Sequence, residues 1–136
     1  MTYFVDTGFF LALKNEKDEF HQKAVEIAAE ILHGRMEPPI SSDYILDEAI
    51  TLVRKRLKKH DTAVEIGKMI KNSKYVKMVK VDSNCISNAF ESYENYNDKD
   101  LSFTDWTNYH IIKQNLLEGI ISPDHHFEQV GIFTLK

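Results

Sequence analysis

Short apolar runs alternate with longer amphipathic segments along the chain. The run at residues 3–5 ends in an acid followed by Thr and Gly, which is typical of a buried strand that ends at the edge of a sheet. A weaker extended piece at 38–41, an alternating segment at 76–81 and apolar runs at 119–122 and 131–135 predict four more strands. Strands separated by helices predict an α/β fold with a mostly parallel sheet and helices on both faces.

Amphipathic segments between these strands predict six helices. Their apolar residues recur at spacings of three and four, and Gly34 is expected to end the second helix. On the fourth helix we expect Val64, Met69 and Ile70 to be buried. The expected helices cover residues 8–13, 19–33, 43–58, 61–72, 83–93 and 103–117.

The bulk composition is that of an ordinary globular domain. The chain has 136 residues, of which 43% are hydrophobic and 28% charged, so residues 1–136 are expected to form a single domain. No apolar run approaches the roughly 20 residues of a membrane-spanning helix, and the N-terminal residues do not resemble a signal peptide. A lone Cys85 excludes an intramolecular disulfide. We therefore expect a cytoplasmic protein with no membrane partner, and Cys85 in its core.

Acidic residues recur where chemistry is favoured in such a fold. Asp6 and Asp124 each follow an apolar strand, and ligands of open parallel sheets bind beyond the strand ends. Glu48 lies on or beside the buried stripe of the third helix, where an unpaired carboxylate is costly, unless the stripe is displaced by one residue. The other explanation for these acids is structural. Asp6 can cap the first helix, and Ser102 with Asp105 matches a capping box at the sixth.

Carboxylates from four separate segments would form an oxygen-rich site that suits Mg²⁺ or Mn²⁺. Such a cation holds phosphates and lowers the pKa of bound water, so the site suits hydrolysis of a phosphodiester. His125 and His126 lack the cysteines that accompany many structural zinc sites, and we interpret His125 as exposed and His126 as a packing or hydrogen-bonding residue. No glycine-rich phosphate loop, dinucleotide fingerprint or serine nucleophile elbow is present.

The net charge of the chain excludes few classes of function. The net charge of −4, from 17 basic and 21 acidic residues, argues mildly against a protein that coats nucleic acid through bulk charge. A basic run, residues 54–59, ends the third helix. Its commonest meaning is a solvated helix end stabilised by the helix dipole, but a phosphate backbone or an acidic segment of a partner would also fit.

Four motifs, in this order, make the chain resemble the PIN-domain family, particularly the VapC-type toxins of toxin–antitoxin pairs. They are Val5-Asp6-Thr7, Asp47-Glu48-Ala49, DLSFTD at 100–105 and SPDHHF at 122–127. The resemblance implies a three-layer α/β/α fold and a Mg²⁺- or Mn²⁺-dependent endoribonuclease acting on RNA. It also implies a protein that is often a homodimer and is commonly inhibited by a cognate antitoxin.

The resemblance also assigns roles to residues of this chain. Asp100 matches an accessory acid of the family, and Thr7 and Ser102 would orient carboxylates or metal-bound water. Within the site, Asp6 and Asp105 would bind the metal, with the remaining acids acting directly or through water. The family's acidic quartet falls on Asp6, Glu48, Asp105 and Asp124.

The chain departs from the family pattern at a few positions. Gly8 replaces a serine that often follows the Asp-Thr pair, and Ser122 stands where threonine is frequent. Trp106 follows Asp105 where a small residue is common, and we expect this tryptophan to pack.

Three alternatives remain open. The same fold could serve a housekeeping RNA-processing nuclease or a structure-specific nuclease. A phosphoacceptor module would need a lysine at the end of a late strand, and residues 119–122 offer none. A non-catalytic binding module would use its acids only as helix caps, and would gain no stability from a divalent cation.

Overall fold

The sheet of this protein is wholly parallel and has five strands in the order β3-β2-β1-β4-β5. The computed structural model describes all residues 1–136. The strands are β1 (Tyr3–Val5), β2 (Ile40–Ser42), β3 (Lys77–Val79), β4 (Gly119–Ile121) and β5 (Thr134–Leu135). The expected α/β architecture is confirmed, because every strand's carboxyl end lies on one edge of the sheet.

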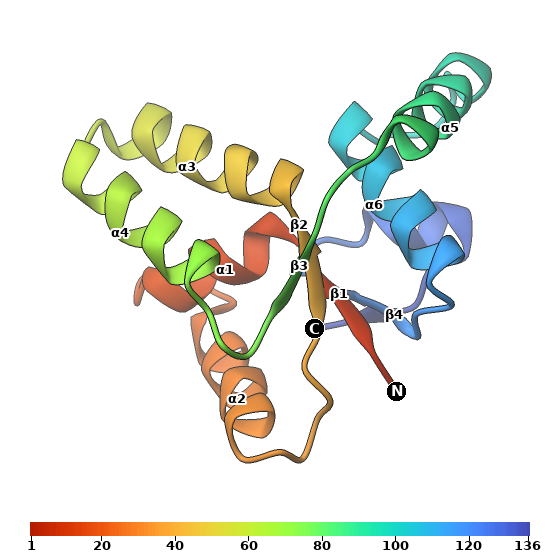
Figure 1. Cartoon of the computed structure of the whole chain (residues 1–136). Coiled ribbons are helices and arrows are strands. Elements are labelled where there is room, and N and C mark those ends of the chain that lie inside the picture. Colours follow the sequence, from red (N-terminus) through yellow and green to blue (C-terminus); the bar gives the residue numbers. More distant parts are fainter.

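Helices cover both faces of the sheet. Figure 1 views it nearly edge-on, with α1 to α4 on one side and α5 and α6 on the other. No helix is both long enough and apolar enough to cross a membrane. The helices are α1 (Thr7–Lys14), α2 (His21–Leu32), α3 (Asp43–Leu57), α4 (His60–Lys71), α5 (Ser83–Asn95) and α6 (Phe103–Gln114), with a 3₁₀ helix η1 (His126–Val130).

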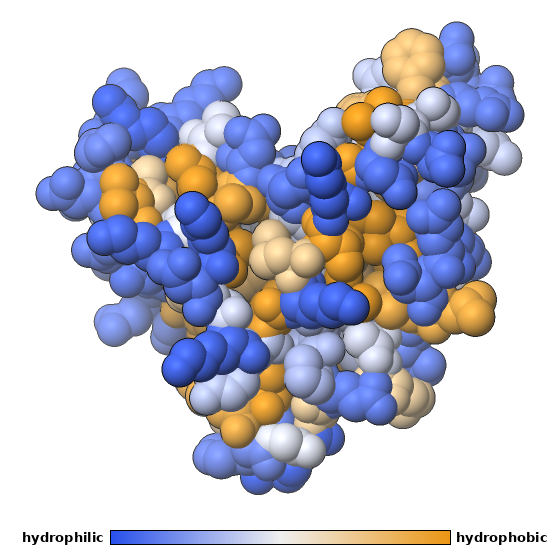
Figure 2. Space-filling view, viewed as in Figure 1, coloured by the Kyte–Doolittle hydropathy of each residue, from blue (hydrophilic) through white to orange (hydrophobic).

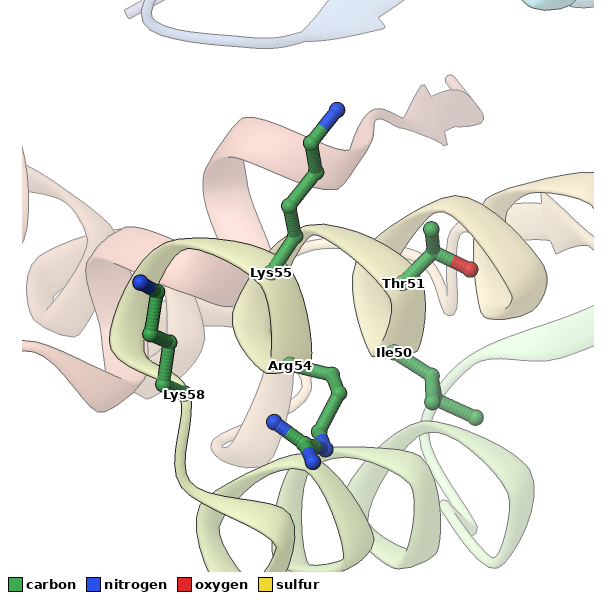
Figure 3. A pocket seen from close by; sticks show the side chains of 5 residues that line it. All are labelled: Ile50, Thr51, Arg54, Lys55 and Lys58. Carbon is green, nitrogen blue, oxygen red and sulfur yellow. The ribbon is translucent and has the colours of Figure 1, made fainter.

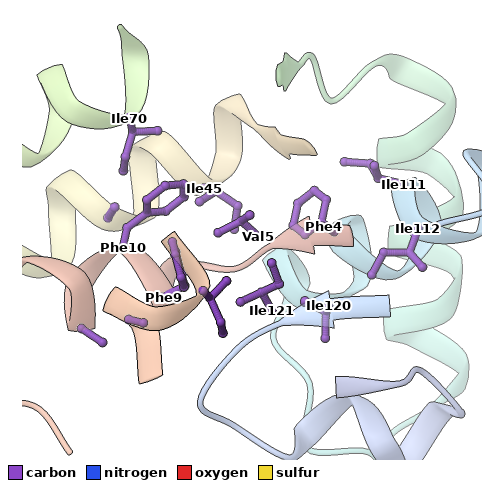
Figure 4. Packing of buried hydrophobic residues seen from close by; sticks show 14 of the residues in the cluster. Phe4, Val5, Phe9, Phe10, Ile45, Ile70, Ile111, Ile112, Ile120 and Ile121 are labelled. Atoms are coloured by element: carbon purple, nitrogen blue, oxygen red, sulfur yellow. The ribbon is translucent and has the colours of Figure 1, made fainter. Parts of the chain in front are cut away.

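The core centres on the middle strand. Phe4 of β1 is aligned with Ile40 of β2 and Ile120 of β4, and both Phe4 and Ile120 are fully buried. Figure 4 shows Ile45 of α3 and Ile111 of α6 approaching this strand from opposite faces. Each such side chain contributes roughly 1.5–3 kcal/mol by leaving water. Burial on both faces holds β1 in place, and therefore also fixes the position of Asp6, the residue that follows it.

Some expected details were wrong. Val64 is 39% exposed, and the buried face of α4 includes Ala63 and Gly67 instead. Small residues face α3 there, and a pattern based on large apolar residues does not detect them. The sixth helix stops at Gln114 rather than residue 117, since Leu116 takes a left-handed conformation, with φ 52°, and the N–H of Leu117 donates to the carbonyl of Ile112. The 3₁₀ helix was not expected, and β3 and β5 are shorter than predicted.

Candidate active site

Asp6 lies at the carboxyl end of β1 and is only 6% exposed. Its backbone N–H donates to the carbonyl of Ile121 at 3.1 Å, so the sheet fixes its position. Its carboxylate accepts the Thr7 N–H at 2.8 Å and the Ser122 hydroxyl at 3.1 Å, and the amide of Asn108 lies 3.5 Å away. The capping interpretation is therefore correct, and the same carboxylate also lies within a buried polar cluster.

The carboxyl of Asp6 titrates far from its ordinary range. Burial raises its pKa to about 7, and the charges of Asp105 and Glu48 contribute to this increase. The hydrogen bonds from Thr7 and Ser122 act in the opposite direction. Near neutral pH the Asp6 carboxyl is therefore partly protonated. A cation bound beside it would displace this proton.

Glu48 reaches the same site from α3. The Thr7 hydroxyl donates to its Oε1 at 2.5 Å, which joins the start of α1 to α3. Burial raises the pKa of Glu48, and the charges of Asp105 and Asp47 raise it further, against the Thr7 hydrogen bond and the charge of Arg56. Glu48 is half-buried and Asp47 is exposed, as the helical pattern predicts.

Asp105 enters from the first turn of α6, where it completes a capping box. Its Oδ2 accepts the N–H of Ser102 at 3.0 Å, and its own N–H donates to the Ser102 hydroxyl at 3.1 Å. Burial raises the pKa of Asp105; the Ser102 hydrogen bonds and the nearby His126 oppose this, and the charge of Asp124 adds to it. Three acids from separate segments therefore act on one another's charge.

Asp124 and Asp100 lie at the rim of this cluster. The side chain of Asp124 is 54% exposed and that of Asp100 is 92% exposed. His126 lies between them, with Nε2 3.7 Å from Asp124 and Nδ1 4.0 Å from Asp100. The Ser122 hydroxyl accepts the N–H of Asp124 at 3.2 Å while donating to Asp6, so one serine connects the rim to the buried centre.

The chain is similar in sequence and in structure to known proteins. Residues 3–132 match the family described as the PIN domain. The chain belongs to the PIN-domain family. The matched residues span nearly the whole chain and include both acids that follow strands, Asp6 and Asp124.

Relatives of this PIN domain match it from end to end. The protein named 23S rRNA-specific endonuclease VapC20, from two strains of Mycobacterium tuberculosis, is 27% identical over 135 residues, which cover 98% of this chain and 97% of the relative. The crystal structure of M. tuberculosis VapC20, described as a sarcin–ricin loop cleaving toxin, has a TM-score of 0.84 at 25% identity, covering 98% of this chain and 97% of that one.

A more distant structure shares the fold alone. It is VapBC2 from Rickettsia felis bound to a DNA fragment from the promoter, with a TM-score of 0.67 at 15% identity. The match covers 99% of this PIN domain and 98% of the other chain.

Sequence reasoning missed two polar residues of the cluster. Asn108 is fully buried, its Nδ2 approaches Asp6, and its Oδ1 has no partner in the protein. Ser122, also fully buried, was noted only as a variation on the family pattern. The spacing offered one signal, because Asn108 lies three residues after Asp105 on the same side of a helix whose neighbouring buried positions are largely apolar.

The donor set fits a hard divalent cation, although the cluster does not form a closed cage. No three acidic, histidine or cysteine side chains converge closely enough to enclose a metal ion in this structure. The donors are nonetheless all oxygens. Burial and the repulsion between neighbouring acids raise the pKa of the carboxyls of Asp6, Glu48 and Asp105. The unpaired amide oxygen of Asn108 adds a further acceptor. Divalent cations such as Mg²⁺ and Mn²⁺ bind this chemistry.

Gly8 has a steric reason to depart from the family pattern. A Cβ atom at this position would lie 2.7 Å from both Cδ and Cγ of Pro123, a ring that cannot rotate away. The close approach of Gly8 to Pro123 therefore helps to place the segment that carries Ser122 and Asp124.

The raised pKa of Asp6 predicts an unusual dependence of stability on pH. Since the folded-state pKa is about 7 and the unfolded value about 3.8, the folded protein binds the extra proton between these values. Without metal, this group should lose about 2–4 kcal/mol of the free energy of unfolding as the pH rises from about 4 to about 7. Urea unfolding in EDTA measures the loss. Asp6→Asn should flatten the profile, and parallel profiles for the two proteins would contradict this prediction.

Proposed function

We propose that this PIN domain is a metal-dependent endoribonuclease and the toxin of a toxin–antitoxin pair. The observation that carries the proposal is the convergence of Asp6, Glu48 and Asp105, from three segments, at the carboxyl edge of a parallel sheet. The match to VapC20 over nearly the full length of both chains supports it. Since VapC20 is named as a 23S rRNA-specific endonuclease, large-subunit ribosomal RNA is the first substrate to test.

The mechanism assigns distinct roles to the acids. A bound Mg²⁺ or Mn²⁺ would stabilise charge on the phosphate and lower the pKa of the attacking water. Asp6 and Asp105 would hold the cation, with Glu48, Asp124 and Asp100 contributing directly or through water. Local hydrogen bonds hold the two outer carboxylates in place, since Thr7 fixes Glu48 and Ser102 fixes Asp105.

Glu48 is also placed to move a proton. Its Oε1 accepts the Thr7 hydroxyl, and its Oε2 has no hydrogen-bond partner in the protein. Burial raises its pKa, which makes it a better base than an exposed carboxylate. In this proposal Oε2 accepts the proton of the attacking water.

The partners follow from the same proposal. A toxin of this type needs a cognate antitoxin, and we propose one, together with a homodimeric state and a cytoplasmic location. Co-expression provides the biological test. The wild type should arrest growth unless its antitoxin is present, whereas a housekeeping RNA-processing enzyme of the same fold would not.

The biochemical test is cleavage of total and ribosomal RNA by the purified protein. Cutting is expected with Mn²⁺ or Mg²⁺, loss of cutting with EDTA, and recovery when Mn²⁺ is restored in excess. Saturating Mn²⁺ should also raise the melting temperature, because a ligand at about 100 times its Kd stabilises the folded state by about 2.7 kcal/mol. Cutting that persists in EDTA, together with an unchanged melting temperature, would show that these acids act only as helix caps.

A further inference from the structure

The end of α3 carries a concentration of cations that the fold does not use. Arg54, Lys55, Arg56, Lys58 and Lys59 are all exposed, and their side chains take part in none of the ion pairs. None of their side chains makes a hydrogen bond within the chain either. These residues are five of the protein's 17 lysines and arginines, although its net charge is −4.

Stability alone does not explain this run. Cations near a helix C-terminus interact well with the dipole, but like charges four residues apart repel, and Arg54 with Lys58 is such a pair. Lys58 also takes a left-handed conformation, with φ 56°, at the C-cap of α3. Glycine is the residue favoured in that conformation, so Lys58 does not add to the stability of this helix end.

One face of α3 joins these cations to the active site. Residues three and seven positions beyond Glu48 share its side of a helix, which places Thr51 and Lys55 on the face of the catalytic acid. Figure 3 shows Thr51 and Lys55 extending to the same side of α3, while Arg54 extends toward α4. We call Thr51 and Lys55 the Lys55 face. Arg54 and Lys58 line the same surface hollow as these two residues.

The surface around α3 is accessible to a large partner. Figure 2 shows hydrophilic side chains along the rim of the lobe formed by α3 and α4, and a notch between this lobe and that of α5 and α6. Glu48 lies on α3 and Asp105 on α6, so the two lobes each supply an acid of the site.

We propose that the Lys55 face binds the phosphate backbone of the RNA substrate on one side of the cut. With a rise of 1.5 Å per residue, Lys55 lies about 10 Å along α3 from Glu48, which is about three nucleotides of a stacked strand at 3.4 Å each. An unpaired cation at this distance from Glu48 suits a contact with a backbone phosphate a few nucleotides from the cut. The inference rests on the proposed nuclease function and names the residues that position its substrate.

RNA binding without cleavage tests this inference. In an Asp6→Asn background, fluorescence anisotropy of a short labelled single-stranded RNA is measured over a range of KCl concentrations. Lys55→Gln should reduce the slope of log affinity against log salt by about 0.7, and affinity roughly fivefold at about 0.1 M salt, as expected for one lost phosphate contact. Lys55→Arg should restore binding. The matched controls, Arg54→Gln in the same turn and Lys71→Gln in the last turn of α4, should have little effect.

Each other outcome is decisive. Equal losses for Lys55→Gln and Arg54→Gln would mean that only bulk charge matters, and would overturn the inference. If Lys55→Gln weakens binding of poly-glutamate but not of RNA, the face is a protein-docking surface instead. Wild-type cleavage is measured in parallel, with the melting temperature as the check on folding. If the wild type cuts RNA in a metal-dependent way but Lys55→Gln leaves the salt slope of RNA affinity unchanged, this inference alone is refuted. If the wild type does not cut RNA at all, the proposed function is refuted, and with it the inference that rests on it.

Discussion

Asp6→Asn is expected to lower the rate of metal-dependent RNA cleavage by about 10²–10³-fold while the protein remains folded. The substitution removes the buried charge that attracts the cation and that Asp105 and Glu48 surround. Asparagine caps a helix about as well as aspartate, so the bond from the Thr7 N–H can be kept. Initial rates on one RNA, compared at saturating Mn²⁺, measure the effect.

Asp82→Asn is the matched control. Asp82 also caps a helix, accepting the N–H of Cys85 at 2.8 Å, but it does not contribute to the raised pKa of the site acids. Its substitution should leave cleavage unchanged. If Asp6→Asn retains wild-type activity through purification and metal titration, Asp6 is not part of the catalytic site.

Gly119→Ala is expected to destabilise the fold by about 3 kcal/mol and to lower the melting temperature by roughly 10 °C. A Cβ atom on Gly119 would lie 2.2 Å from the carbonyl oxygen of Phe133. That oxygen accepts the N–H of Ile120 at 2.9 Å, so the strands β4 and β5 would have to separate. Since β4 leads directly to Ser122 and Asp124, cleavage should fall as well. Thermal and urea unfolding measure the change.

Gly131→Ala separates this steric effect from a backbone effect. Gly131 has φ +75°, and nothing lies within 4 Å of the position of its Cβ atom. Its substitution should cost only the roughly 1–2 kcal/mol of a left-handed alanine. Equal destabilisation by the two alanines would contradict the proposed clash with Phe133.

The strands and the positions of Asp6 and Glu48 were accessible from the sequence because they depend on short-range patterns. An apolar run ending in an acid identified β1 with Asp6, and helical spacing placed Glu48 near the core and Asp47 in solvent. The face of α4 was less accessible, since Ala63 and Gly67 are buried through the approach of α3 rather than through their own hydrophobicity. Tertiary packing decided that face.

The site acids could not be separated from helix caps by sequence alone. Asp6 caps α1, and Asp105 belongs to a capping box, so the residue types required by the two explanations are the same. Only the folded structure shows that these caps lie near one another and near Glu48. Asn108 illustrates the same limit, because a single polar residue in a helix gives no indication of a contact with a residue 102 positions away.

The contact between Gly8 and Pro123 leads us to expect that these two positions change together during evolution. Proline at the second position requires glycine at the first, since a Cβ atom would meet its ring at 2.7 Å. PIN domains with the more common serine at the first position are therefore expected to carry a non-proline residue at the second. A graft of the usual serine into this chain would need a compensating replacement of Pro123. The two residues are thus expected to form a covarying pair that links the first turn of α1, directly after the first strand, to the segment after the fourth.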